Sequence, residues 1–380
     1  MTPELESLIG RIQPLAEAAG RAARERENQL TKPPGSLGRL EDLAVQLAGI
    51  TGQARPRFVH KAVIVLAGDH GVAAAGVSAY PPAVTAQMVL NFLSGGAAIN
   101  VLARRAGARV VVGDLGVAAD FPEHPGLVRA KIGRGTRNML EGPAMTRDEA
   151  LAAVSAGAEI LEAEARRGLD LLAIGEMGIG NTTAASAIVA ALTGRPVAEV
   201  TGRGTGIDEV TWQRKVAAIE RALEINRPNP GDPLDVLAKV GGFEIAGLVG
   251  VVLAAAGRRV PVLVDGFISS AAALVAAEIC PRARDYLIAA HRSVEVGHRV
   301  ILDRLGLRPY LDLDLRLGEG TGAVLAMGLV DAAAAILDEM ATFAEAGVSA
   351  RSPTDGQPAA DPDARRRPFP LEGPDSTSDG

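Results

Sequence analysis

A glutamate flanked by glycines is the residue best suited to acid–base chemistry in this sequence. In LRLGEGTGAVLAMG, Glu319 lies between Gly318 and Gly320, ahead of an apolar helix expected to begin near residue 323. The glycines leave room for a bound molecule, and apolar surroundings raise the pKa of a carboxyl group toward the range of a general base. We therefore predict that Glu319 is a general base. The alternative is that it only favours the start of the helix through the helix dipole.

A glycine-rich turn at residues 175–183 is suited to hold a phosphate. The segment LDLLAIGEMGIGNTTAASAIVAAL predicts a buried strand, a turn with three glycines, and a helix. Small residues let backbone N–H groups approach an anion, and a helix start adds unpaired donors and a favourable dipole. The turn has neither the dinucleotide-fold nor the P-loop pattern. A tight turn whose Asn181 or Thr182 merely caps the helix is the alternative interpretation.

A second glycine cluster, TGRGTGIDEV at 201–210, precedes a segment that contains Lys215. A flexible surface loop has the same composition. Together with the first turn, however, the cluster predicts a loop that clamps a phosphate from the other side, with Lys215 as a point charge.

Two expected strands end in acidic residues. Asp69 and His70 follow VIVLAG, and Asp265 follows VPVLV. We expect both acids at the edge of the sheet where ligands bind, in reach of ribose hydroxyls. A structural role, capping a neighbouring helix or loop, is at least as well supported for each of them.

His291, Glu295 and His298 are spaced to share one face of a helix, which could in principle present metal ligands. Such spacing also arises readily on a solvated helix, and metal-binding helices more often carry His-Glu-x-x-His, so we expect no metal and no other cofactor. Covalent catalysis is not expected either. The sequence has no Gly-x-Ser-x-Gly elbow, and its one cysteine, Cys280, lies at an expected helix end.

The composition predicts an α/β protein. Hydrophobic residues make up 48% of the 380 residues and aromatic residues only 3%, so the core must consist of small aliphatic side chains, the usual filling of parallel strands covered by helices. The net charge of −6 argues against nucleic-acid partners. A single cysteine and an acidic N-terminus favour the cytoplasm. We expect no membrane span, because the longest apolar run, 245–256, falls short of the roughly 18 residues required.

Four short β-branched runs that end in Gly or Asp are the expected strands: KAVIVLAGDHG, ARVVVGDLG, LDLLAIGEMG and RRVPVLVDGF. Ala-rich helical stretches separate them, at 83–106, 147–167, 184–192, 245–256 and 270–278. This alternation predicts a parallel, Rossmann-like sheet with helices on both faces and the carboxyl ends of the strands on one edge. Residues 1–50 are expected to be helical, and 349–380 to form a disordered tail because they have little to bury.

Six segments, in unbroken order from about residue 30 to residue 340, together resemble one family. They are KPPGSLGRLEDLAVQLAG (32–49), AGDHGV (67–72), GEMGIGNTT (175–183), DVLAKVGGFEIAGLVGV (235–251), VLVDGFISSAAAL (262–274) and RLGEGTGAVLAM (316–327). The chain resembles nicotinate-nucleotide:5,6-dimethylbenzimidazole phosphoribosyltransferases. The resemblance implies transfer of the phosphoribosyl group of nicotinate mononucleotide to a benzimidazole nitrogen, giving α-ribazole 5′-phosphate for the lower ligand of cobalamin. It implies no metal, since the pyridinium leaving group is already cationic.

The resemblance also implies roles for individual residues. Glu319 would remove the benzimidazole N–H proton while the other ring nitrogen attacks the anomeric carbon with inversion, and Glu176 would lie beside the ribose and nicotinate. The residues implied to hold the 5′-phosphate are Gly178, Ile179, Gly180, Asn181, Thr182, Gly202, Gly204 and Lys215. Segment 76–88 looks like the wall of the benzimidazole pocket, with Tyr80 and Met88 as candidate contacts.

At the level of the whole chain, the resemblance implies a homodimer in which the neighbouring subunit closes part of the site. It also implies a small helical domain formed by residues 1–50 with 325–348, beside an α/β domain at 51–324. Two other functions stay open. A nucleotide-dependent oxidoreductase lacks its fingerprint here, and a non-catalytic binder of benzimidazoles or nucleotides would need the same pockets.

Overall fold

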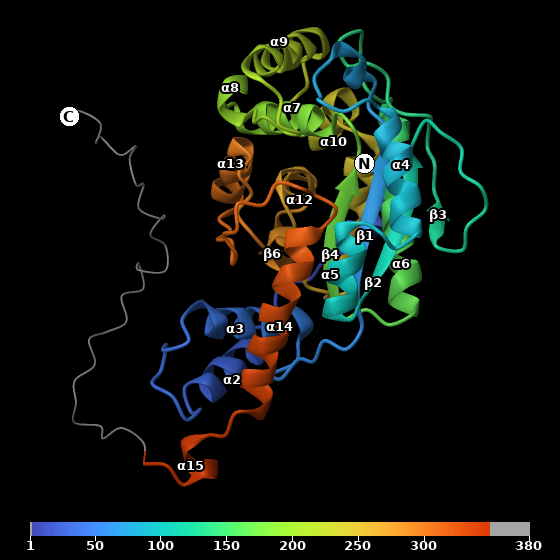
Figure 1. The fold of residues 1–380 in the computed structure, drawn as a ribbon. Coiled ribbons are helices and arrows are strands. Elements are labelled where there is room, and N and C mark those ends of the chain that lie inside the picture. The colour runs from blue at the N-terminus through green and yellow to red at the C-terminus, as the bar shows by residue number, and fades with distance from the viewer. Residues whose placement is uncertain (1, 350–380) are drawn as a thin grey trace, which may run out of the picture.

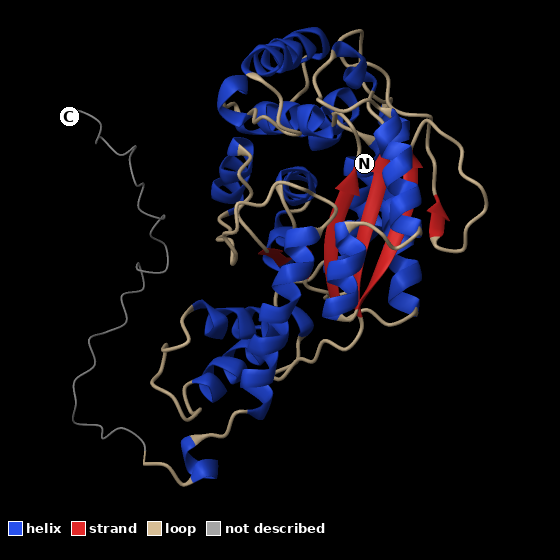
Figure 2. Cartoon of the chain, in the orientation of Figure 1, coloured by secondary structure: helices blue, strands red, loops and turns tan. Residues whose placement is uncertain are grey.

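The computed structural model describes residues 2–349 of the chain, and a parallel six-stranded sheet lies at its centre. The strand order is β3-β2-β1-β4-β5-β6, and every neighbouring pair is parallel. The strands are β1 (Lys61–Gly68), β2 (Ala108–Gly116), β3 (Leu127–Arg129), β4 (Leu171–Met177), β5 (Val262–Val264) and β6 (Leu287–Ala289). The α/β prediction is confirmed (Figure 2). The predicted tail, apart from Ser349, lies outside the described residues.

The four predicted strands are β1, β2, β4 and β5. In β1 every residue after Lys61 is buried, as expected for a strand that is covered on both faces. The edge strands β3 and β6 were not predicted, because three residues such as LVR or LIA are too few to show a pattern. Their pairing depends on the neighbouring strands β2 and β5.

Helices cover both faces of the sheet (Figure 1). They are α1 (Pro3–Gly10), α2 (Glu17–Glu27), α3 (Arg39–Thr51), α4 (Ala83–Leu93), α5 (Ala98–Ala106), α6 (Arg147–Arg166), α7 (Asn181–Thr193), α8 (Val197–Val200), α9 (Glu209–Asn226), α10 (Pro233–Val240), α11 (Phe243–Gly257), α12 (Phe267–Ile279), α13 (Val296–Leu305), α14 (Thr321–Glu339) and α15 (Phe343–Ala346), with 3₁₀ turns η1 (Gly71–Ala75) and η2 (Pro281–Tyr286). A Cβ at Gly247 in α11 would meet Leu66 of β1, whereas one at Gly320, before α14, would meet Val63. Leu66 and Val63 point to opposite faces of the strand, so α11 and α14 cover opposite faces.

All five predicted helical stretches differ from the observed bounds, and in two of them a glycine explains the difference. Residues 83–106 form two helices, α4 and α5, because Gly95 adopts a left-handed conformation (φ 77°) between them. Helix α7 begins at Asn181 rather than at residue 184, directly after Gly180, whose φ of 98° ends the preceding turn. The glycine turn therefore leads straight into a helix N-terminus.

Two helical segments, 83–106 and 321–339, are long and apolar enough to cross a membrane by length and composition alone. The prediction that no run reaches that length was therefore wrong. The core helix of a soluble protein passes the same test, and α14 packs against α3, α5, β4 and β5.

The N-terminal helices pack against the C-terminal one. Helices α2 and α3 contact each other and α14, and an isolated bridge joins Leu30 to Thr342. In Figure 1 α2, α3 and the far end of α14 lie together, away from the sheet. Helix α1, in contrast, packs on α11 of the α/β layer. The division into domains stays a prediction.

Candidate active site

The turn that carries Glu319 lies directly on strand β4. A Cβ on Gly175 would lie 2.3 Å from the backbone oxygen of Glu319, so a residue other than glycine cannot occupy this position without displacing the turn. Gly318, Glu319 and Gly320 all have positive φ, at 86°, 61° and 89°. A left-handed conformation is unfavourable for glutamate by roughly 1–2 kcal/mol. Such strain persists where the surrounding structure enforces it, as at active sites.

Glu319 is buried and has one described hydrogen-bond donor. Its Oε2 accepts a hydrogen bond from the backbone N–H of Ile99, in the first turn of α5, at 3.1 Å. Burial raises the pKa of Glu319, the N–H of Ile99 opposes this, and the nearby charge of Asp265 adds to the increase. The environment therefore moves the carboxyl group in the direction that a general base requires.

A second buried glutamate faces the same turn. A Cβ on Gly318 would lie 2.4 Å from Oε1 of Glu176, at the end of β4, and the side-chain amide of Asn181 donates a short hydrogen bond to Oε2. Burial first, and then the charges of Glu244 and Asp265, raise the pKa of Glu176 to about 8. The two predicted catalytic residues thus meet at one glycine turn, Glu319 as part of it and Glu176 with its carboxyl group against Gly318. Asn181 points its amide at one of them.

The predicted phosphate turn is built by close backbone contacts. A Cβ on Gly178 would lie 2.3 Å from the carbonyl oxygen of Gly68. The N–H of Ile179 donates to Oγ1 of Thr85 in α4 at 3.0 Å. Because α7 begins at Asn181, the turn lies at a helix N-terminus, which favours an anion.

Lys215 brings the two glycine clusters together. Its Nζ donates to Oγ1 of Thr182 at 2.8 Å and lies 3.5 Å from the carbonyl oxygen of Gly202, and a Cβ on Gly204 would lie 3.3 Å from it. The side chain is fully buried, and burial lowers its pKa to about 8, partly offset by Glu295. A buried cation at a helix N-terminus is a suitable partner for a phosphate.

Glu295 was not predicted to lie here. Its Oε1 accepts a hydrogen bond from the N–H of Gly204 at 2.8 Å, and its buried Oε2 has no hydrogen-bond partner among the described residues. The prediction that Glu295 shares a helical face with His291 and His298 is wrong. Helix α13 begins only at Val296, so His291 and Glu295 precede it. His291 instead pairs with Leu311 in an isolated bridge, which holds residue 291 in an extended segment.

His298 has a structural role that fixes its tautomer. Its Nδ1 accepts the backbone N–H of Ser293, so Nε2 carries the hydrogen and donates to Oγ of Ser270 at 2.9 Å. Burial lowers the pKa of His298 to about 3, with a further contribution from His291. Within residues 2–349, no group of three or more His, Cys, Asp or Glu side chains is arranged to hold a metal ion.

Asp265 is engaged in capping α14. Its Oδ2 and Oδ1 accept the backbone N–H groups of Gly320 and Ala323 at 3.2 and 3.0 Å, and Nε2 of His291 lies 3.4 Å from Oδ1. These contacts agree with the structural alternative for this residue. A contact with ribose stays a prediction.

The predicted base-pocket segment contacts the second glycine cluster (201–210), which is predicted to clamp the phosphate. The N–H of Ala79 donates to Oγ1 of Thr205 at 3.0 Å, between Gly204 and Gly206. Tyr80 is 55% exposed, and Met88, in α4, is partly buried against the core. A contact of Tyr80 or Met88 with the base stays a prediction.

Glu244 is a buried residue that sequence reasoning did not single out. Its Oε1 lies 2.6 Å from Nε2 of His70, which follows β1, although 174 residues separate the two. The glycine pair before Glu244 in VGGFE was a signal of close packing, but nothing in the local sequence identifies the partner. Asp69 was expected beside a ligand, and its Oδ2 accepts the N–H of Ala118.

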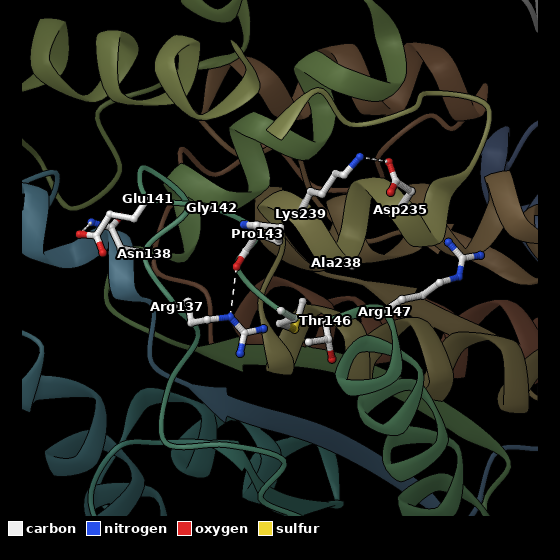
Figure 3. Close-up of a pocket in the computed structure, with 11 residues that line it drawn as sticks. Arg137, Asn138, Glu141, Gly142, Pro143, Thr146, Arg147, Asp235, Ala238 and Lys239 are labelled. Carbon is white, nitrogen blue, oxygen red and sulfur yellow. Dashed lines mark hydrogen bonds and ion pairs between the residues drawn. The ribbon is translucent and has the colours of Figure 1, made fainter. Parts of the chain in front are cut away.

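One cavity is lined by none of these residues (Figure 3). It has a volume of about 560 Å³ and is lined by residues 137–147 and by α10, among them Arg137, Arg147 and Lys239. Each of these cations is paired with a carboxylate, of Glu149, Asp232 and Asp235. Every cation that lines the cavity is therefore paired, so the cavity offers no free positive charge to a phosphate.

Comparison with known proteins agrees with this geometry. A family described as "Phosphoribosyltransferase" matches residues 12–348. The chain belongs to this family. Several relatives are named nicotinate-nucleotide–dimethylbenzimidazole phosphoribosyltransferase. The chain is 64% identical to the one from Chloroflexus aggregans, and the match covers 91% of this chain and 98% of the relative. It is 62% identical to that of a Roseiflexus species over the same shares of the two chains.

Solved structures agree as well. The crystal structure of the correspondingly named enzyme from Thermus thermophilus superposes with a TM-score of 0.84 at 52% identity, over 88% of this chain and 99% of that one. A second structure from the same organism gives a TM-score of 0.85 at 53% identity, over 87% and 99% of the two chains. This phosphoribosyltransferase therefore shares both sequence and fold with them along nearly their whole length.

Proposed function

We propose that this enzyme transfers the phosphoribosyl group of nicotinate mononucleotide to 5,6-dimethylbenzimidazole, giving α-ribazole 5′-phosphate and nicotinate for cobalamin synthesis. The observation that carries the proposal is the contact of Gly175 with the backbone of Glu319. This contact holds Glu319, a buried carboxyl group with a raised pKa, beside the glycine turn that follows β4. That turn leads into the N-terminus of α7, where the buried ammonium group of Lys215 donates to Thr182.

In this reaction the 5′-phosphate would be held by backbone N–H groups of the turn at 178–182 and by the ammonium group of Lys215. The N–H groups of Ile179 and Asn181 donate to Thr85 and Gly178, so these two residues shape the turn while the other N–H groups face the anion. Glu319 accepts the N–H proton of the benzimidazole, and the other ring nitrogen attacks the anomeric carbon. The carbon–nitrogen bond to nicotinate breaks, and its electron pair neutralises the pyridinium. Attack from the opposite face converts a β-nucleotide into an α-nucleotide.

Glu176 would lie beside the ribose and the departing nicotinate. Its neighbours Glu244 and Asp265 raise its pKa, and a cationic pyridinium nearby favours the ionised carboxylate. A negative charge there stabilises positive charge that develops on the sugar as the bond breaks. Substrate binding and proton release from Glu176 would therefore be coupled.

Several further features belong to the proposal. Tyr80 and Met88 would contact the base, and Asp265 the ribose side of the site. The enzyme would act in the cytoplasm as a homodimer in which the neighbour closes part of the site. Exposed apolar side chains on three helices support such an interface: Leu90 on α4, Val101 on α5 and Leu325 on α14, between 39% and 48% exposed. The small domain of residues 1–50 with 325–348 is part of the same proposal.

The test is conversion of nicotinate mononucleotide and dimethylbenzimidazole by the purified full chain in the presence of EDTA. Chromatography should show nicotinate and α-ribazole 5′-phosphate in equal amounts. Binding of both substrates without nicotinate release would instead indicate a non-catalytic binder, and reduction of a nicotinamide dinucleotide would indicate an oxidoreductase.

A further inference from the structure

A buried histidine–glutamate pair lies beside the predicted phosphate turn. No contact with the substrate is assigned to it above, although the charge of Glu244 contributes to the raised pKa of Glu176. Nε2 of His70 lies 2.6 Å from Oε1 of Glu244, and the side chains are 1% and 0% exposed. His70 follows β1 and Glu244 lies in the first turn of α11. The pair therefore joins the end of β1 to the start of α11, at the edge of the sheet where the glycine turn lies.

Several glycines lie against this pair, among them Gly178, Gly180 and Gly242. A Cβ on Gly242 would lie 2.3 Å from Cε1 of His70, so the imidazole occupies the space that a side chain would need. A Cβ on Gly178 would lie 3.3 Å from Oε1 of Glu244, and one on Gly180 would lie 3.3 Å from Cβ of His70. Gly178 and Gly180 belong to the predicted phosphate turn, so the turn packs against the side chains of His70 and Glu244.

The carboxylate of Glu244 depends on His70 for its hydrogen bond. Its second oxygen, Oε2, is buried without a hydrogen-bond partner among the described residues. A buried charged group that loses its one partner is left with the full cost of desolvation, so it must shift toward water or toward another donor. Loss of the imidazole would therefore disturb the residues packed against the carboxylate, which include the turn.

We propose that His70 and Glu244 are positioning residues, whose hydrogen bond holds the turn at 178–182 in the conformation that binds the 5′-phosphate. The inference rests on the proposed function and deepens it, because it assigns affinity for the nucleotide to two side chains that have no proposed contact with the substrate. Affinity for the acceptor base does not depend on this hydrogen bond.

The main test is the His70→Ala variant of the full-length enzyme. We expect its KM and its calorimetric Kd for nicotinate mononucleotide to rise about tenfold, the effect of one lost hydrogen bond of roughly 1.4 kcal/mol. The KM for dimethylbenzimidazole should stay within about twofold of the wild-type value. His70 borders a cavity of about 350 Å³. Imidazole added to the variant should enter there and restore nucleotide affinity.

Glu244 supplies the conservative comparison. Glu244→Gln keeps an oxygen that accepts from Nε2 of His70 and should retain most of the nucleotide affinity, whereas Glu244→Ala should lose it as His70→Ala does. Glu164→Ala is the matched control, because Glu164 is also buried but lies near the end of α6, where it is paired with Arg167 and with Arg109 at the start of β2. It should lower the melting temperature without changing either KM.

Nucleotide affinity that stays within about twofold of wild type in both alanine variants would overturn the inference. An equal rise in the KM of the base would do so too, since that indicates a general loss of structure. If the wild type binds nicotinate mononucleotide without turnover, the proposed function fails. The Kd values of the variants would still show whether His70 and Glu244 support binding of the nucleotide. If His70→Ala does not fold, the two Glu244 variants make the same comparison.

Discussion

The raised pKa of Glu176 predicts a pH dependence of stability that one substitution should remove. Burial and neighbouring charges raise the pKa of this carboxyl group from its usual value of 4.5 to about 8. Between these values the folded chain holds a proton that the unfolded chain has released, so stability is greatest below the unfolded pKa and is lost as the pH rises through the folded one. The loss is roughly 1.4 kcal/mol per pH unit and at most about 5 kcal/mol over the whole window.

The assay compares urea unfolding of the wild type with that of Glu176→Gln near pH 5.5 and near pH 7.5. Glutamine keeps the shape of the protonated acid and cannot ionise. The wild type should therefore lose roughly 2–3 kcal/mol more than the variant between the two pH values. Glu164→Gln, another buried carboxylate, controls for the loss of an acid in general. If wild type and Glu176→Gln lose stability in parallel, Glu176 does not hold a proton in the folded state and the electrostatic reasoning is refuted.

Three further substitutions test the site. Lys215→Met should raise the KM for nicotinate mononucleotide by about 10- to 100-fold, the value of one hydrogen bond to a charged group, and initial rates that change only in kcat would contradict this. Gly175→Ala should lower the free energy of unfolding, measured in urea, by more than about 2 kcal/mol, because the new methyl group would meet the backbone of Glu319. Gly328→Ala is the control: Gly328 lies on α14 with open space around it, so the change should be neutral or stabilising. Thr205→Val should raise the KM for the base because it removes the acceptor for the N–H of Ala79, and Thr205→Ser should restore it; equal values for both variants would argue against this link between the loop and the base pocket.

Much of the fold could be predicted because its central strands are long and apolar. β1, β2, β4 and β5 stand out as β-branched runs that end in glycine or aspartate, and their order along the chain with intervening helices indicates a parallel sheet. The edge strands β3 and β6 could not be predicted, since three residues carry no period and their pairing is decided by the tertiary structure.

The candidate site was predictable at the positions where close backbone contacts leave room only for glycine. Gly175, Gly178 and Gly318 each occupy a position at which a Cβ would meet another atom within 2.5 Å, so the clusters that carry them mark the site in the sequence. Partners brought in from distant segments left no such mark. The pairing of Glu244 with His70 and the contact of Glu295 with Gly204 of the second glycine cluster follow from the fold alone.

The central claim is that Glu319 accepts the proton of the attacking base. The most direct measurement is single-turnover conversion of nicotinate mononucleotide and dimethylbenzimidazole by wild type and Glu319→Gln with EDTA present. The account predicts a decrease in the chemical rate by about 100-fold or more, with the Kd for nicotinate mononucleotide within about threefold of wild type. A Glu319→Gln variant that forms α-ribazole 5′-phosphate at the wild-type rate would contradict it.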